Sequence, residues 1–281
     1  MMRSWRHLVM IVCCLFLLSG CAVRMLYNWL DWAIVWKLDD YFDLSRKQKN
    51  VLGEQVDELL QWHRKQALPD YVVALRALSF DLRRPLTEAE VEHHLQTFER
   101  LSRQLAEGLK TPANRFAVVL TDEQIQQFVH ERWKKLREQR DEFKEKNGQK
   151  VYASFKKKLE KNLRNWIGDL DPAQQPLIEQ SSQWQRQYYA SWLDYQEVWV
   201  QAVEKTLAAR GTPEFERGLV LVLLNGDELG DGRFRQYLAD SRARSVTWFA
   251  ALSASLTPRQ REELRGRLSD LAADLEALHK G

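Results

Sequence analysis

The sequence contains few residues that fix a chain covalently or break a helix. Its three cysteines are Cys13, Cys14 and Cys21, so the 260 residues after Cys21 in this 281-residue chain contain no thiol for a disulfide. The 12 glycines and 7 prolines fall mainly between stretches with apolar periodicity. These shortages exclude a small disulfide-stapled domain, and they require a hydrophobic core to stabilise the fold.

Strand patterns and membrane-length apolar runs are also scarce. One β-like run, LVLVLL at 219–224, follows TPEFERG and leads into a glycine-rich turn. We expect a short buried helix over 213–224, with a strand as the alternative. No apolar run reaches the roughly 20 residues that span a bilayer.

The first 20 residues, together with Cys21, have the pattern of a signal peptide and its cleavage site. Residues 1–7 include two arginines, and 8–18 are uncharged and almost wholly apolar, which is typical of a secretory signal. Leu-Ser-Gly-Cys follows at 18–21 and resembles the bacterial lipobox. The resemblance implies cleavage between Gly20 and Cys21 and lipid attachment at Cys21. An ordinary secretory signal or an uncleaved anchor is the alternative.

The predicted cleavage defines the location and the charge of the mature chain. Ala22, in place of Asp, implies sorting to the outer membrane of a Gram-negative cell, facing the periplasm and anchored through acyl chains on Cys21. The 261 remaining residues suffice for one large or two small domains. They carry 40 Lys and Arg against 39 Asp and Glu, because only Arg3 and Arg6 are removed. We therefore expect no nucleic-acid partner.

A helix-start signal recurs along the chain. Leu, a capping residue, and Gln or Glu three positions later occur at 44–48, 86–90, 120–124, 170–174 and 256–260. Each can form a capping box, in which the first side chain and the Gln or Glu satisfy backbone amides reciprocally. Thr111-Pro112 and Thr212-Pro213 indicate two further starts without the box. The starts are too unevenly spaced for tandem repeats.

The fold predicted from these signals is all-α, a bundle of long, mostly antiparallel helices with capping-box starts. We expect further helices at 25–41 and 69–83 and long ones at 122–147 and 172–209, the last kinked near Pro176. Gly148 should interrupt its helix.

The chain divides into three parts. Residues 1–20 are the lipoprotein signal peptide, and 21–42 hold the lipidated cysteine and an aromatic membrane-proximal helix. Residues 43–281 form a helical periplasmic domain, and a subdivision near 165–171 stays open.

Two aromatic stripes stand out. Tyr27, Trp29, Trp32 and Trp36 follow Cys21 closely, and we expect them to pack into the bundle, with a helix lying on the membrane as the alternative. The second stripe has helical spacing and is expected to be core; it consists of Trp184, Tyr188, Trp192, Tyr195 and Trp199. The short distance from Cys21 to the rings of the first stripe leaves no room for a long flexible tether between the lipid and the domain.

Residues 131–164 are the marked charge imbalance, with thirteen Lys and Arg against six Asp and Glu. A solvated helix face explains such a run most simply. The functional alternative is an interaction surface for anionic partners, made by Lys156, Lys157, Lys158, Lys161 and Arg164.

Catalytic signals are weak. Glu90 and His94 are four residues apart and could share a metal, but no third ligand has suitable spacing. Nucleophile-elbow, phosphate-loop and dinucleotide motifs are absent from the sequence. We predict no catalytic residue, no metal and no cofactor, and therefore a protein that is not an enzyme.

Two family resemblances add to this interpretation. Leu-Thr-x-x-Gln at 120–124 and 256–260 is similar to the motif of small periplasmic stress chaperones, all-α proteins that bind unfolded clients. CAVRMLYNWLDWAIVWKLDDYFDLSRKQK with WHRKQALPDY resembles a family of uncharacterised proteobacterial lipoproteins. The sequence thus predicts a non-catalytic binding or assembly protein of the cell envelope with an unidentified protein partner. A chaperone of unfolded clients and an envelope hydrolase are the alternatives.

Overall fold

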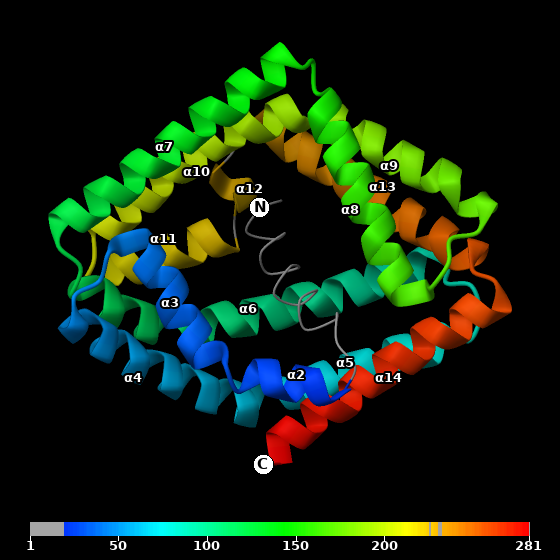
Figure 1. Cartoon of the computed structure of the whole chain (residues 1–281), viewed down its shortest axis with the longest axis horizontal. Helices are drawn as coiled ribbons and strands as arrows, with labels where there is room; N and C mark the ends of the chain where they lie inside the picture. The colour runs from blue at the N-terminus through cyan, green and yellow to red at the C-terminus, as the bar shows by residue number, and fades with distance from the viewer. Residues whose placement is uncertain (1–19, 225, 230–231, 281) are drawn as a thin grey trace.

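The computed structural model describes residues 20–224, 226–229 and 232–280, and of 20–23, 226–227 and 232–234 only the backbone. Every regular element in these ranges is helical, and they contain no strand. Most of the long helices run along the sides of a four-cornered frame, and α6 (Glu88–Val118) crosses it between the left and right corners (Figure 1). The all-α prediction is confirmed.

The helices differ in length from one to eight turns. They are α2 (Gly20–Tyr27), α3 (Leu30–Phe42), α4 (Arg46–Trp62), the π-helical turn η1 (His63–Ala67), α5 (Leu68–Asp81), α6 (Glu88–Val118), α7 (Asp122–Glu145), α8 (Gln149–Ile167), the 3-10 turn η2 (Pro172–Gln174), α9 (Gln175–Gln187), α10 (Tyr189–Ala208), α11 (Pro213–Leu223), α12 (Gly226–Leu229), α13 (Gly232–Ser255) and α14 (Pro258–Lys280).

Antiparallel pairs make the sides of the frame. Helix α7 lies against α10, α8 against α9, α4 against α6, and α5 against α14 (Figure 1). Five buried clusters follow these contacts, and the largest joins the end of α3 to α4, α6, α7 and α10. Among the described residues, none of the helices combines the length and hydropathy needed to cross a bilayer.

All five predicted capping boxes are present. At each start the Ser, Thr or Asp side chain accepts a hydrogen bond from a backbone N–H of the first turn. The Gln or Glu side chain accepts a hydrogen bond from the backbone N–H of the capping residue. Local spacing suffices to predict these bonds because both partners lie within four residues of each other.

The four glutamines of the capping boxes also pair across the fold. Gln48 and Gln124 exchange side-chain amide hydrogen bonds of 2.7 and 3.1 Å, and Gln174 and Gln260 exchange bonds of 2.8 and 3.2 Å. Each glutamine also donates to a backbone carbonyl of the opposing turn. The first pair joins the α3–α4 turn to the α6–α7 turn at the left corner of the frame (Figure 1). The second joins the α8–α9 and α13–α14 turns at the right corner.

One predicted helix start is wrong. No helix begins at Thr111, because α6 continues through Pro112 to Val118. Residues buried on both sides of the proline, Ala106 and Phe116, keep one apolar stripe in register. Packing of this stripe outweighs the roughly 3 kcal/mol that an internal proline costs.

Two predicted helices are interrupted where the sequence shows no breaker. The helix expected at 25–41 bends at Asn28 and Trp29, and the Asn28 side chain accepts a hydrogen bond from Arg64 (3.0 Å). The helix expected at 172–209 breaks at Tyr188 and not at Pro176, which sits in the first turn of α9. Arg244 donates to the Tyr188 hydroxyl (2.6 Å), so a tertiary contact fixes the break.

Other expectations are confirmed. Residues 213–223 are helical in α11, and Gly148 lies in the break between α7 and α8, in a left-handed conformation with φ 69°. In the second aromatic stripe Trp192 and Tyr195 are buried, and the other three rings pack against core clusters. That stripe is core.

Candidate functional site

The segment that follows the predicted lipidation site enters the core at once. The predicted signal segment up to Ser19 lies outside the described residues, and only the helical backbone is described for Gly20 and Cys21. Tyr27, six residues after Cys21, is 1 % exposed and packs with Leu68 of α5 and Leu275 of α14. Helix α2 is therefore an integral part of the bundle and not a tether.

Polar contacts fix α2 as well. The Tyr27 hydroxyl lies 2.8 Å from Nδ1 of His63, in the π-helical turn, and the Arg64 guanidinium lies 5.1 Å from the centre of the Tyr27 ring. Burial raises the pKa of Tyr27 to about 12, against an opposing effect of Arg64, and burial lowers the pKa of His63 to about 4. Both groups are neutral at neutral pH. Arg24 adds an ion pair with Asp274 (3.5 Å).

The three tryptophans of the first stripe do not pack into the bundle as expected. Trp29, Trp32 and Trp36 are 56, 60 and 56 % exposed, whereas Tyr27 alone is buried. The ring centres of Trp29 and Trp32 are 6.4 Å apart, and those of Trp32 and Trp36 are 6.1 Å apart. We call these three residues the Trp ladder.

Helix geometry explains why the ladder faces outward. The opposite face of α3 carries Ile34, Val35 and Leu38, which pack against the largest core cluster. Since a helix turns by about 100° per residue, residues 29, 32 and 36 fall on the side away from that cluster. Helix α3 thus has two apolar faces, and the described part of the chain covers only one of them.

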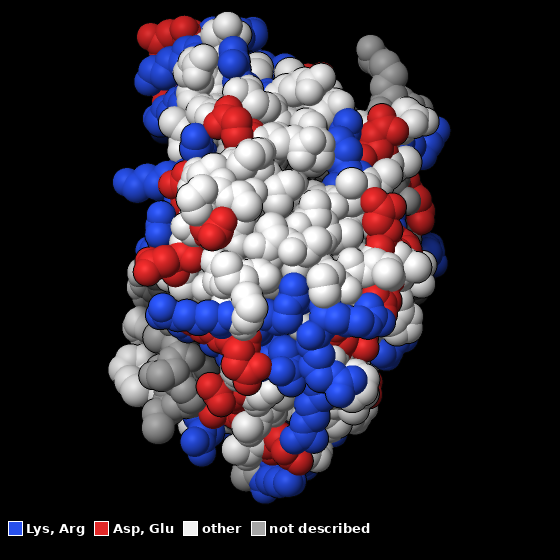
Figure 2. Space-filling model, turned by 90° about the vertical axis from the view of Figure 1, so that its right-hand side faces the viewer, with Lys and Arg blue, Asp and Glu red and all other residues white. Residues whose placement is uncertain are grey.

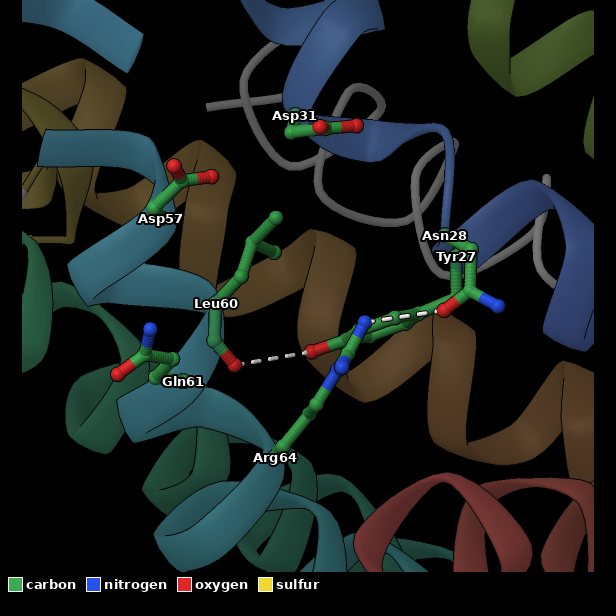
Figure 3. Close-up of a pocket in the computed structure, with 7 residues that line it drawn as sticks. All are labelled: Tyr27, Asn28, Asp31, Asp57, Leu60, Gln61 and Arg64. Carbon is green, nitrogen blue, oxygen red and sulfur yellow. Dashed lines mark hydrogen bonds between the residues drawn. The ribbon is translucent and has the colours of Figure 1, made fainter. Parts of the chain in front are cut away.

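A small open pocket of about 160 Å³ lies between the α2–α3 bend and α4 (Figure 3). Asp31, Asp57 and Arg64 supply its charges, and no two of them form an ion pair. Asp31 lies on the side of α3 that faces α4, roughly opposite the ladder. Two carboxylates, a guanidinium and the side-chain amides of Asn28 and Gln61 line the pocket, so it offers binding groups for a small polar molecule.

The structure divides the predicted basic surface on α8. Lys157, Lys161 and Arg164 are exposed at spacings of four and three, which places them on one face of the helix. Lys156 instead pairs with Glu179 of α9 (3.0 Å), and Lys158 is half-buried. We call Lys157, Lys161 and Arg164 the α8 basic stripe.

Sequence reasoning missed a second basic region. Figure 2 shows a band of Lys and Arg across the side of the molecule where α5 ends and α14 begins. Exposed arginines of these two segments are Arg83, Arg84, Arg259 and Arg267. RRP at 83–85 and RQREELRGR at 259–267 were the available signals, but nothing in the sequence shows that the two segments meet.

Contacts within this region are mainly structural. Arg261 donates to the carbonyls of Leu82 (3.3 Å) and Ser253 (2.7 Å), and Arg265 donates to that of Ser79 (3.0 Å). These carbonyls lie at or near the C-terminal ends of helices, where they lack helical donors.

The pair considered as metal ligands is separated by other partners. The Glu90 carboxylate accepts from Arg84 and Thr87, whereas His94 pairs with Asp81 (3.0 Å). Across the described ranges, no three His, Cys, Asp or Glu side chains cluster in a way that could hold a metal ion.

The fold places the chain among all-α proteins built from long antiparallel helices. The chain belongs to a family of unknown function, DUF6279, whose model matches residues 40–235. No curated protein and no solved structure matches the chain. The matched segment begins within α3 and ends within α13, so it contains neither the segment that resembles a lipobox nor the Trp ladder.

Proposed function

We propose that the protein is a lipoprotein of the outer membrane, anchored on the periplasmic face through acyl chains on Cys21, and that it acts as a non-catalytic binding or assembly protein of the cell envelope. The burial of Tyr27 only six residues after Cys21 supports this most directly. A lipid at that position would hold the folded domain directly at the membrane surface. The lipobox supplies the second support.

The α8 basic stripe is the preferred surface for an envelope partner. Neither Lys157 nor Lys161 forms an ion pair with a described residue, and Arg164 is 3.7 Å from the exposed Asp169. Three exposed positive charges on one face favour an acidic partner protein. An enzymatic role lacks comparable support, because the sequence contains no recognised catalytic motif.

Lipidation is tested by metabolic labelling with a palmitate analogue. The native chain should incorporate the label, and Cys21→Ser should abolish both labelling and signal cleavage, since the lipid is attached through the thiol. Label that persists on the serine variant would contradict the proposal.

Partner binding is tested by crosslinking the native lipoprotein in cells. Reversing the α8 basic stripe, with Lys157→Glu, Lys161→Glu and Arg164→Glu, should remove the crosslink to one defined complex while the helical circular dichroism spectrum stays unchanged. Lys134→Glu, Arg137→Glu and Lys144→Glu on α7 make a control with the same change in charge. Lys156 is left intact because Glu179 would lose its partner.

A chaperone for unfolded clients is the second candidate. Both Leu-Thr-x-x-Gln motifs serve the corners of the fold, each paired with another turn, which explains their presence without client binding. A chaperone should suppress aggregation of a reporter protein at near-stoichiometric amounts. An assembly factor should instead leave the reporter unaffected.

A further inference from the structure

We propose that the Trp ladder is the surface by which the domain contacts the membrane, with its three indoles in the lipid headgroup layer. This inference rests on the proposed lipidation of Cys21. It adds an orientation to that proposal: the outer face of α3 lies on the bilayer, and the pocket between the α2–α3 bend and α4 faces away from the bilayer.

The short separation between Cys21 and the three tryptophans keeps the ladder near the membrane. Trp29 lies eight residues after Cys21, which corresponds to about 12 Å along a helix, and Trp36 lies about 22 Å along. The bend at Asn28 shortens both separations. Because Tyr27 is buried and Arg24 pairs with Asp274, α2 cannot swing to carry the anchor away from α3.

The chemistry of the exposed side chains fits this layer. Indole rings favour the boundary between headgroups and acyl chains, since each ring is largely apolar and has one N–H donor. Three adjoining, half-exposed tryptophans form a continuous apolar surface that water solvates poorly. Val73 and Phe80 of α5 and Phe249 of α13, which are also exposed, lie on other helices and do not make a second group of three rings.

The charges beside the ladder indicate which bilayers it contacts. Lys37 lies at its edge, 5.8 Å from the centre of the Trp36 ring, and is paired with Asp40 (2.7 Å). The ladder therefore has little net charge next to it. Insertion should depend on apolar contact and not on anionic lipid, so it should withstand high salt.

Quenching by brominated lipids tests the contact. The full-length lipoprotein is reconstituted into phosphatidylcholine vesicles whose acyl chains carry bromine near the headgroup, and tryptophan emission is compared with that in unbrominated vesicles. The native protein should be quenched equally at low and high salt. Trp29→Gln, Trp32→Gln and Trp36→Gln together should abolish the quenching, because the other tryptophans of the described chain pack within the domain.

The control is Phe80→Gln with Phe249→Gln, which removes two exposed rings from other faces and should leave the quenching unchanged. Circular dichroism shows whether each variant stays folded. Quenching that is absent in the native protein, or equal in the triple variant, overturns the proposal.

Other occupants of the ladder give distinct results. If a second copy covered the ladder, lipid quenching would be absent and sedimentation would show a dimer that the triple variant breaks. If an envelope protein covered it, quenching in vesicles would remain but crosslinks in cells would fall in the triple variant, which would make the lipid contact a secondary one and overturn the proposal. Palmitate labelling is independent of all these outcomes, so a failed quenching test leaves the lipoprotein proposal standing.

Discussion

At the scale of single residues, the glutamines of the capping boxes contribute more than a cap. Gln174 is 0 % exposed, and its side chain bonds to Gln260 and to the carbonyl of Ser255 (3.4 Å). Gln48 and Gln124 do the same at the other corner. A buried amide contributes to stability only when its partners remain, so each pair has to be retained or lost as a unit.

Gln124→Ala should therefore destabilise the protein more than a lost cap does. The change removes the acceptor for the Thr121 amide and the donor to Phe42 and Asp43, and it strips Gln48 of one partner. We expect a loss of about 2–3 kcal/mol in unfolding free energy, compared with about 1 kcal/mol for Thr121→Ala. Urea denaturation measures both. Gln126→Ala, exposed on the same helix, should have little effect.

The buried His63 should make stability depend on pH. Its pKa is about 4 in the folded protein because burial disfavours the charged ring, against 6.5 for an exposed histidine. Between these values the unfolded chain holds a proton that the folded protein lacks. Stability is thus complete above pH 6.5 and falls as the pH drops to about 4, by about 3 kcal/mol in total.

Chemical denaturation near pH 7 and near pH 5 measures this loss, where about 2 kcal/mol of it should be visible. His63→Gln cannot take up the proton, and it keeps an acceptor for Tyr27. An equal pH dependence in that variant would show that other groups cause the loss.

At the scale of elements, the sequence predicts helix starts better than helix breaks. Helix starts are determined by local hydrogen bonds, such as the one between Thr121 and Gln124. The breaks at Asn28 and Tyr188 instead depend on Arg64 and Arg244, which come from other parts of the chain. The two aromatic stripes have the same period, yet one is core and the other exposed. Periodicity shows which residues share a face and cannot show what covers it.

Glycines in the α4–α6 pair give a matched test of packing. An added Cβ at Gly108 would lie 2.4 Å from the Trp62 ring, while one at Gly53 would meet nothing within 4 Å. Gly53→Ala should raise the unfolding free energy by about 0.5–1 kcal/mol, because alanine loses less backbone entropy. Gly108→Ala should lower it by about 1–3 kcal/mol. Thermal unfolding compares the two, and stabilisation by both would show that Trp62 moves freely.

At the scale of the whole molecule, the frame is closed by its last helix. Leu271, Leu275 and Leu278 of α14 are buried against Tyr27 and Leu68. The family model ends at residue 235, before α14 begins. The described fold nevertheless depends on this helix, because α14 supplies four of the seven buried residues of this cluster.

A chain that ends at Thr257 should accordingly fail to fold, although it retains all of the segment that the family model matches. We expect loss of helical signal well beyond the 23 residues of α14, and rapid proteolysis in α2 and α5. A chain that ends at His279 keeps every buried leucine of α14 and should behave like the full chain. Protection of α5 in the shorter chain would contradict this dependence.

The same closure has a consequence in time. The α5 residues Leu68 and Val72 emerge during synthesis about 200 residues before Leu271 and Leu275, the side chains that bury them. At about 5–20 residues per second this interval is on the order of 10–40 s. During this interval, apolar side chains of the first half of the chain have been synthesised, but the helix that buries them has not. The nascent protein thus has a long window in which aggregation competes with folding, and a holding factor would shorten its exposure.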